Sequence, residues 1–438
     1  RGMAASSILE PMVRLYNITK KNDYLKFAEY IVQSWNSAAG PELVTKALQN
    51  IPVGERYPIP KNWFGPLNGR KAYEMMSCYE GLLELYRITG NPNYLQAVKN
   101  TAESIRQNEI FITGSGATIE NWYNGAAIQA TPALHPQETC VSATWMKLCF
   151  QLLRTTGDAK WANEIEKTFY NALLAAMKPD GRTWNQYTEI MGVKHLGEDQ
   201  CGMLINCCIA SGPRGMMVLP KEAFMTTQNG VVVNFYTSAT ANLFINKNKS
   251  ATLSVQTEYP KTNEIVIQVE PSGQNDFDVL LRLPDWSSNN IITVNGQIIK
   301  PDTWNGYAVL NRNWKKGDVI KLTLDMAIRE FTVKSEPTKF ALLYGPLVLA
   351  SDNRYQSDPF YLFYNPVKKQ GQIPFEIMKT NKNADVYMEL KTSFNHEIAG
   401  GNEQKELTLI DLASSGNTWD SKSAYLFWFQ RPLDFRIH

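Results

Sequence analysis

The stretch LYRITGNPNYLQAVKNT, residues 85–101, predicts the end of one helix, a polar turn and the start of a second helix. LYNITKKNDYLKFAEYI at residues 15–31 and LLRTTGDAKWANEIEKT at residues 152–168 share this plan, and each second helix opens on Tyr or Trp. Each copy therefore predicts an αα-hairpin, and a spacing of about 70 residues leaves room for long connecting loops. Stacked hairpins with long loops at one end are typical of an α/α toroid whose loops build a pocket.

The apolar pattern changes its period near residue 225. Before that point apolar residues recur at helical spacing, as in residues 141–153, VSATWMKLCFQLL. After it, short alternating runs such as EIVIQVE at 264–270 are separated by turn signals such as Asn295-Gly296, which indicates antiparallel strands. The expected domains are a catalytic toroid at 1–225, a β-sandwich at 226–351 and a further β-rich region at 352–438.

Composition excludes several classes of function. A formal net charge of +2 over 438 residues provides no polybasic surface for nucleic acid or anionic lipid. The chain has no apolar run of membrane length, so we expect no membrane insertion. Its first residues carry no signal peptide and resemble the middle of a helix, so any signal peptide and the first helices are expected upstream.

The six cysteines are too few for a disulfide scaffold, and most of them gather near residues 140 and 201–208. Glu138, Cys140, Cys207 and Cys208 are four ligands of the types that zinc accepts, supplied by two short segments. The Gly-Pro-Arg-Gly sequence after the cysteine pair predicts an irregular turn that directs adjacent side chains to one metal. Cys78 and Cys149 fall in helical stripes and are expected in the core, whereas Cys201 stays unassigned.

The loop from Glu109 to Gln137 is too long and too rich in Gly, Trp and Tyr to be a simple linker. It ends where the helix carrying Cys140 begins, and the exposed N–H groups of a helix N-terminus favour carboxylate and thiolate. In the β half, Trp286, Trp304 and Trp314 either form a sugar-stacking platform or lie in the core.

These features together resemble a known family. The hairpin repeat, the Glu-Thr-Cys at 138–140, the pair Cys207-Cys208 and the trailing β domain are similar to the β-L-arabinofuranosidase-type glycoside hydrolases of family 127, formerly a domain of unknown function. The resemblance covers residues 8–350 and implies an (α/α)6-type barrel, of which this chain would lack the first helices, followed by an antiparallel β-sandwich. It also implies zinc held by Glu138, Cys140, Cys207 and Cys208.

The resemblance further implies the catalytic roles. Cys207 corresponds to the nucleophile, and Glu120 matches the upstream general acid/base across a small gap, with Glu189 and Glu198 as the alternatives. Substrate contacts are expected from Arg214, His135, His195 and Trp122. The sequence departs from the family after the cysteine pair, where residues 209–215 replace a Pro-rich segment.

The predicted function is that of a retaining exo-glycosidase, which releases a terminal furanose from plant-type glycans and carries Zn²⁺. The expected sugar is β-L-arabinofuranose or an acidic branched furanose, because Arg214 could pair with a substrate carboxylate. The alternatives are a metal-free toroid hydrolase or polysaccharide lyase, in which the cysteines only brace the loop, and a non-catalytic glycan-binding scaffold. The substrate type favours a periplasmic or secreted location, and the oligomeric state is left open.

Overall fold

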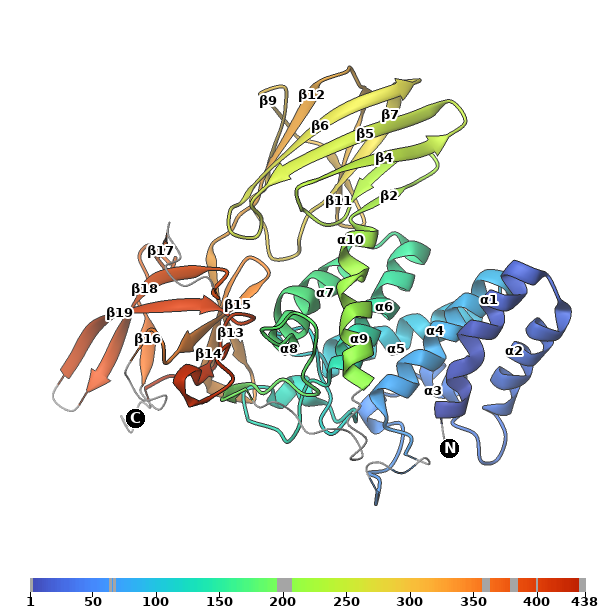
Figure 1. The fold of residues 1–438 in the computed structure, drawn as a ribbon, viewed down its shortest axis with the longest axis horizontal. Coiled ribbons are helices and arrows are strands. Elements are labelled where there is room, and N and C mark those ends of the chain that lie inside the picture. The colour runs from blue at the N-terminus through green and yellow to red at the C-terminus, as the bar shows by residue number, and fades with distance from the viewer. Residues whose placement is uncertain are drawn as a thin grey trace.

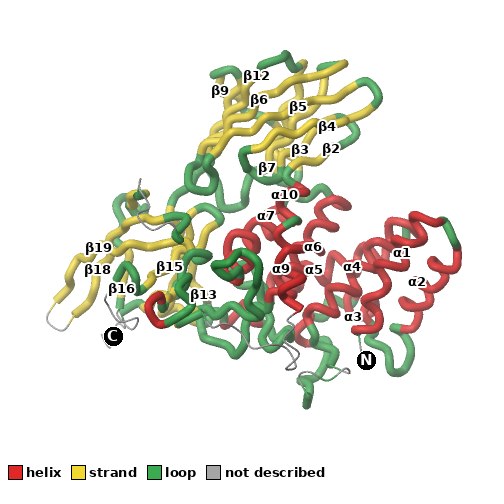
Figure 2. Tube along the Cα trace, in the orientation of Figure 1, coloured by secondary structure: helices red, strands yellow, loops and turns green. Residues whose placement is uncertain are grey.

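The computed structural model describes residues 3–62, 65, 68–194, 207–356, 363–378, 385–398 and 401–432. Its first half is helical and its second half is built from strands, as the change of period predicts (Figures 1 and 2). The three predicted hairpins are α1 (Leu9–Thr19) with α2 (Asn22–Ser34), α4 (Ala72–Thr89) with α5 (Pro92–Asn108), and α6 (Thr139–Thr156) with α7 (Lys160–Thr168). The other α-helices in the described part of the chain are α3 (Leu43–Leu48), α8 (Leu174–Ala176), α9 (Cys207–Met216) and α10 (Val218–Glu222).

Local signals in the sequence end and start these helices. Gly90 and Gly157 follow α4 and α6 with φ of 70° and 64°, a left-handed conformation that glycine adopts without steric cost. At the start of α5 the side chain of Asn91 accepts a hydrogen bond from the backbone N–H of Asn93 at 3.1 Å. The hairpin turns therefore follow from a few consecutive residues.

The first helices of the hairpins form one continuous inner row. Helix α1 packs on α4, α4 on α6, and α6 on α9, while α2, α5 and α7 lie on the outer side. A buried ion network crosses this row, because Lys147 of α6 pairs with Glu80 of α4 at 2.8 Å and with Glu10 of α1. The row is the arc of a helical toroid, and it brings the N-termini of α4, α6 and α9 together.

Two sheets packed face to face form the β-sandwich above the helices in Figure 1. The five-stranded sheet, in spatial order, contains β10 (Asp302–Trp304), β11 (Tyr307–Asn313), β7 (Asp276–Arg282), β3 (Gly230–Val233) and β2 (Phe224–Thr226). The six-stranded sheet contains β4 (Ala239–Asn246), β5 (Lys249–Thr257), β6 (Glu264–Gly273), β12 (Asp318–Thr323), β8 (Ile291–Val294) and β9 (Gln297–Ile299). All neighbouring strands described here are antiparallel except β3 and β7, which run parallel.

A third sheet gathers the C-terminal strands. It contains β13 (Ile328–Val333), β14 (Glu336–Tyr344), β15 (Leu347–Asp352), β16 (Tyr364–Pro366), β17 (Phe375–Ile377), β18 (Glu389–Ile398), β19 (Gly401–Asp411), β20 (Tyr425–Leu426), β21 (Phe429–Gln430) and, from the helical half, β1 (Met191–Gly192). The expected bounds of 226–351 place β13 to β15 in the sandwich, whereas these strands belong to the sheet of the C-terminal strands. Strand pairing at such sequence separation leaves no local signal.

A buried ion pair joins the helical half to the sandwich. Arg282 of β7 and Glu166 of α7 are both almost fully buried, and the hydroxyl of Tyr259 donates a hydrogen bond to the same carboxylate at 2.8 Å. Such a pair fixes the position of two domains because either charge left alone would be buried without compensation. In the described part of the chain, no helix is long and apolar enough to cross a membrane.

Candidate active site

Glu138, Cys140, Cys207 and Cys208 converge on one point. One ligand atom from each residue lies within 4.8 Å of all the others. The sulfur of Cys140 lies 3.1 Å from that of Cys207 and 3.5 Å from that of Cys208, and a Glu138 oxygen lies 3.8 and 3.9 Å from the same two sulfurs. These sulfur separations are too long for a disulfide, whose S–S bond measures about 2.05 Å.

Helix N-termini hold all four side chains. Glu138 is the N-cap residue of α6 and Cys140 lies in its first turn, while Cys207 and Cys208 open α9. The prediction of an irregular turn at Gly212-Pro213-Arg214-Gly215 was wrong, because these residues continue α9. The positive ends of two helix dipoles therefore point at the cluster, which favours thiolates and a carboxylate there.

The two glycines in α9 allow the helix to pack closely. A Cβ atom on Gly212 would lie 2.1 Å from the indole of Trp184, and one on Gly215 would lie 3.0 Å from Leu173. Next to Trp184, the carbonyl of Gln186 accepts a hydrogen bond from the backbone N–H of Thr139 at 2.9 Å. The segment around Trp184 thus connects the start of α6 with the face of α9.

The donor set fits a divalent metal ion. Burial raises the pKa of Glu138 well above its usual value, and the hydrogen bond from Cys140 to Cys207 raises the pKa of Cys140. Four acidic groups this close cannot ionise together without a cation. Their separations approach the edge of about 3.8 Å that tetrahedral Zn–S bonds of about 2.3 Å would span. The cluster can therefore bind a metal, and three sulfurs with one oxygen are ligands that suit zinc.

A cavity of about 410 Å³ opens beside the cluster and is lined by Glu138, Cys140 and Cys207 but not by Cys208. Cys207 is exposed and Cys208 is buried. Glu120 also lines this cavity, so the structure brings together both residues that the resemblance assigns to catalysis.

Glu120 is held by two neighbours. Its carboxylate pairs with the ammonium group of Lys71, and the hydroxyl of Tyr187 lies 3.5 Å from its other oxygen. Its backbone has φ of 63°, a left-handed conformation that is uncommon for a residue with a side chain. This constraint directs a largely buried carboxylate into the cavity, as expected of a functional residue rather than of a solvated loop glutamate.

Glu74 is a site residue that sequence reasoning missed. It lies in the first turn of α4 and lines the cavity, and burial raises the pKa of its carboxyl group. Its place on an inner helix is the only signal in the sequence, and many other carboxylates share that signal. Glu74 is therefore a second candidate for proton transfer.

The predicted substrate contacts have different outcomes. Arg214 lines the cavity, donates a hydrogen bond to Thr144 at 2.9 Å and lies over the ring of Tyr73 at 5.9 Å. His135 is exposed, and its ring stacks on that of Tyr187 with 4.6 Å between centroids.

Trp122 does not fit a substrate contact, because its side chain is fully buried in the helical core. The surrounding loop packs back on the helices instead of projecting from them. His195, Glu198 and Cys201 lie outside the described residues.

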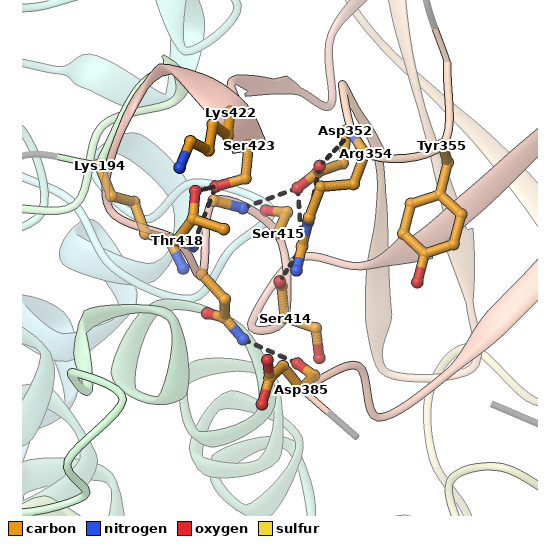
Figure 3. A network of polar contacts seen from close by, with 12 residues as sticks. Lys194, Asp352, Arg354, Tyr355, Asp385, Ser414, Ser415, Thr418, Lys422 and Ser423 are labelled. Carbon is orange, nitrogen blue, oxygen red and sulfur yellow. Dashed lines mark hydrogen bonds and ion pairs between the residues drawn. The ribbon is translucent and has the colours of Figure 1, made fainter. Parts of the chain in front are cut away.

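The C-terminal sheet anchors the chain upstream of Cys207. Strand β1 pairs with β20, so that Met191 lies opposite Leu426, and the hydroxyl of Tyr425 donates to the carbonyl of Glu189. Figure 3 shows Lys194 beside the loop that carries Ser414 and Thr418, where its ammonium group donates to the carbonyl of Ala413 at 3.2 Å. The C-terminal region thereby holds residues 189–194, which precede the cysteine pair in the sequence.

Comparison with known proteins identifies the class. Residues 4–221 match the β-L-arabinofuranosidase GH127 catalytic domain, and residues 230–326 match the GH127 middle domain. The chain therefore belongs to the GH127 family of glycoside hydrolases, as the resemblance in its sequence predicts.

Individual relatives agree with this assignment. A non-reducing end β-L-arabinofuranosidase from Bifidobacterium longum subsp. longum is 22% identical over 299 residues, which cover 62% of this chain and 44% of that protein. The chain thus spans less than half the length of this curated relative. A GH127 β-L-arabinofuranosidase from Geobacillus stearothermophilus T6 has a similar structure, with a TM-score of 0.77, 18% identity and coverage of 97% of this chain and 72% of that one. A second GH127 β-arabinofuranosidase gives a TM-score of 0.75 at 21% identity, covering 96% of this chain and 68% of that one.

Proposed function

We propose that the protein is a retaining exo-glycosidase that releases terminal β-L-arabinofuranose from plant-type glycans. The observation that carries this proposal is one cavity shared by an exposed thiol, Cys207, and a constrained carboxylate, Glu120. A retaining mechanism needs a nucleophile at the anomeric carbon and an acid at the leaving oxygen. The activity in the name of the Bifidobacterium relative supports the choice of sugar.

In the first step the thiolate of Cys207 attacks the anomeric carbon while Glu120 donates its proton to the departing glycosidic oxygen. The C–O bond breaks and a C–S bond forms. In the second step Glu120 accepts a proton from water, the water oxygen attacks the anomeric carbon, and the C–S bond breaks to release Cys207 as thiolate. Two displacements at one carbon retain its configuration.

We assign Glu138, Cys140, Cys207 and Cys208 as the residues that would hold zinc. When bound, zinc would keep the thiols deprotonated at neutral pH and make the thiolate a better leaving group. Burial supports Cys207 rather than Cys208 as the nucleophile, since only Cys207 lines the cavity.

Arg214 is proposed to orient the substrate, because it lines the same cavity as Cys207 and Glu120. If the natural substrate is an acidic branched furanose, this guanidinium group would pair with its carboxylate. We also propose a periplasmic or secreted location, because the proposed substrate is of plant origin.

Turnover of 4-nitrophenyl β-L-arabinofuranoside by the purified protein tests the proposal. NMR of the first sugar released should show the β anomer, and the α-linked substrate should react at least about 100-fold more slowly. A protein with a full complement of metal that cleaves no furanoside would support a non-catalytic glycan-binding scaffold. Unchanged turnover after complete removal of metal would support the metal-free hydrolase.

A further inference from the structure

A second cavity lies at the opposite end of α6, between the helices and the sandwich. It has a volume of about 540 Å³ and is walled by the C-terminal end of α6, by α10 and by the five-stranded sheet. Its volume is within the usual range for small-molecule sites. Because α6 contains 18 residues, its two ends are separated by about 27 Å, so this cavity is distinct from the one beside Cys207.

An exposed aromatic ring forms one wall. Trp304 is 50% exposed, and its ring lies so close to Gly157 that a Cβ atom there would approach it to 2.8 Å. The turn after Trp304 is docked on the α6–α7 turn, where the backbone N–H of Ala159 donates to the carbonyl of Asn305 at 2.9 Å. The docked turn therefore holds the exposed ring of Trp304 in a fixed position.

A carboxylate also lines this cavity. Glu222 is only 5% exposed, yet within the described part of the chain its carboxylate makes no hydrogen bond or ion pair. Burial raises the pKa of Glu222 to about 7. Glu222 lines the cavity, so its carboxylate oxygens can accept hydrogen bonds from the hydroxyl groups of a molecule bound there.

Two cations complete the cavity at its rim. Arg154 and Lys221 are exposed, and each lies over the ring of Phe150, at 5.0 and 5.6 Å from its centroid. Neither forms an ion pair with any described residue of the chain. The cavity thus presents an apolar ring, hydrogen-bond donors and a hydrogen-bond acceptor around one space.

We propose that this cavity is a second glycan-binding site, which takes a neutral saccharide with its ring against Trp304. A sugar ring has an apolar face of C–H groups, which suits an aromatic surface, and hydroxyl groups that both donate and accept hydrogen bonds. The hydroxyls of the sugar donate to Glu222 and accept from Arg154 and Lys221. A fully anionic ligand fits less well, because the carboxylate of Glu222 lines the same cavity and would repel it.

Affinity electrophoresis of the full chain tests this proposal, with gels containing debranched arabinan, arabinoxylan or arabinogalactan. The native protein should be retarded by at least one of these glycans. Trp304→Ala should weaken the binding at least tenfold, and Glu222→Gln, which keeps the shape of the side chain, should weaken it about fivefold. Phe244→Ala is the matched control, because Phe244 is also an exposed aromatic residue of the sandwich and lies outside the cavity.

Hydrolysis of a small aryl arabinofuranoside should be unchanged in Trp304→Ala and in Glu222→Gln, because the cavity lies far from Cys207. This measurement distinguishes the second site from the proposed catalytic site. If the proposed catalytic function were wrong, the retardation by glycan would still be observed. Retardation by none of the three glycans would overturn the proposal. Equal retardation of the native protein and of both variants would overturn it as well.

Discussion

Gly212 of α9 packs directly against the indole of Trp184, at a distance that leaves no room for a Cβ atom. The contact lies one helical turn after Cys208, so it sets how closely the cysteine pair approaches Glu138 and Cys140. Positioning of a metal site within about 0.5 Å depends on such supporting contacts.

Gly212→Ala should therefore separate the two halves of the cluster. We expect a loss of bound metal and a fall in activity of at least about 100-fold, because misplacement of about 1 Å can have that effect. Gly215→Ala is the matched control, since its Cβ would meet only the flexible ends of Leu173 and the methyl group of Ala143. Metal content measured by elemental analysis should fall much more in the first variant, and equal metal content in the two would refute the role assigned to Trp184.

Substitution of single cysteines tests the ligand set. Cys140→Ser and Cys208→Ser should lower zinc content from about one per chain and lower activity in parallel, because each removes one ligand. Cys149→Ser serves as the control, because Cys149 is buried in α6 outside the cluster. If metal content were unchanged in Cys140→Ser, the ion would have to be bound elsewhere.

The dependence of the rate on the leaving group tests whether Glu120 or Glu74 is the general acid. Glu120→Gln should slow hydrolysis of natural linkages by roughly 10²–10⁴-fold and spare activated aryl glycosides in the first step. Glu74→Gln should have a smaller effect on both substrates, because the amide resembles the protonated acid that burial favours at Glu74. The measurement is kcat/KM on both substrates. If Glu74→Gln instead slowed natural linkages and spared aryl glycosides, the general acid would be Glu74.

The ion network of the inner row makes stability depend on pH. Burial raises the pKa of Glu80 to about 7, above the value of about 4.3 expected in the unfolded chain. As the pH falls from 7 to 5, the folded protein therefore binds a proton before the unfolded chain does, and protonation relieves the cost of the buried charge.

Lys147→Met removes the cation next to Glu80 and should reduce the free energy of unfolding by about 3 kcal/mol at pH 8. The loss should shrink at pH 5, where Glu80 is protonated. Lys160→Met is the control, because its ion pairs are exposed and should contribute less than about 1 kcal/mol. Denaturant titrations at both pH values measure the difference, and a loss that is independent of pH would exclude Glu80 as its cause.

Sequence patterns were sufficient where the determinants are local. The turns at Gly90 and Gly157 and the four possible metal ligands could be recognised because a few consecutive residues carry each signal. Glu74 and the third sheet could not be recognised from the sequence. Only tertiary contacts bring Glu74 to the cavity and pair β1 with β20.

The burial of Trp122 and the continuation of α9 through Pro213 were not predicted from the sequence. Trp122 lies in a long loop, yet that loop folds back and places the indole in the core. Pro213 and two glycines suggested a turn, but close packing against Trp184 and Leu173 makes the glycines favourable within α9.

Covalent labelling of Cys207 tests the central claim most directly. Only one of two adjacent sulfurs can lie in line with the anomeric carbon at the near-attack distance of about 3–3.5 Å, and Cys207 is the one that lines the cavity. An electrophilic furanose mimic should therefore react with one site per chain, and only while metal is bound. Peptide mapping should place the adduct on Cys207, whereas an adduct on Cys208 or Glu138, or no adduct in an active preparation, would contradict the mechanism.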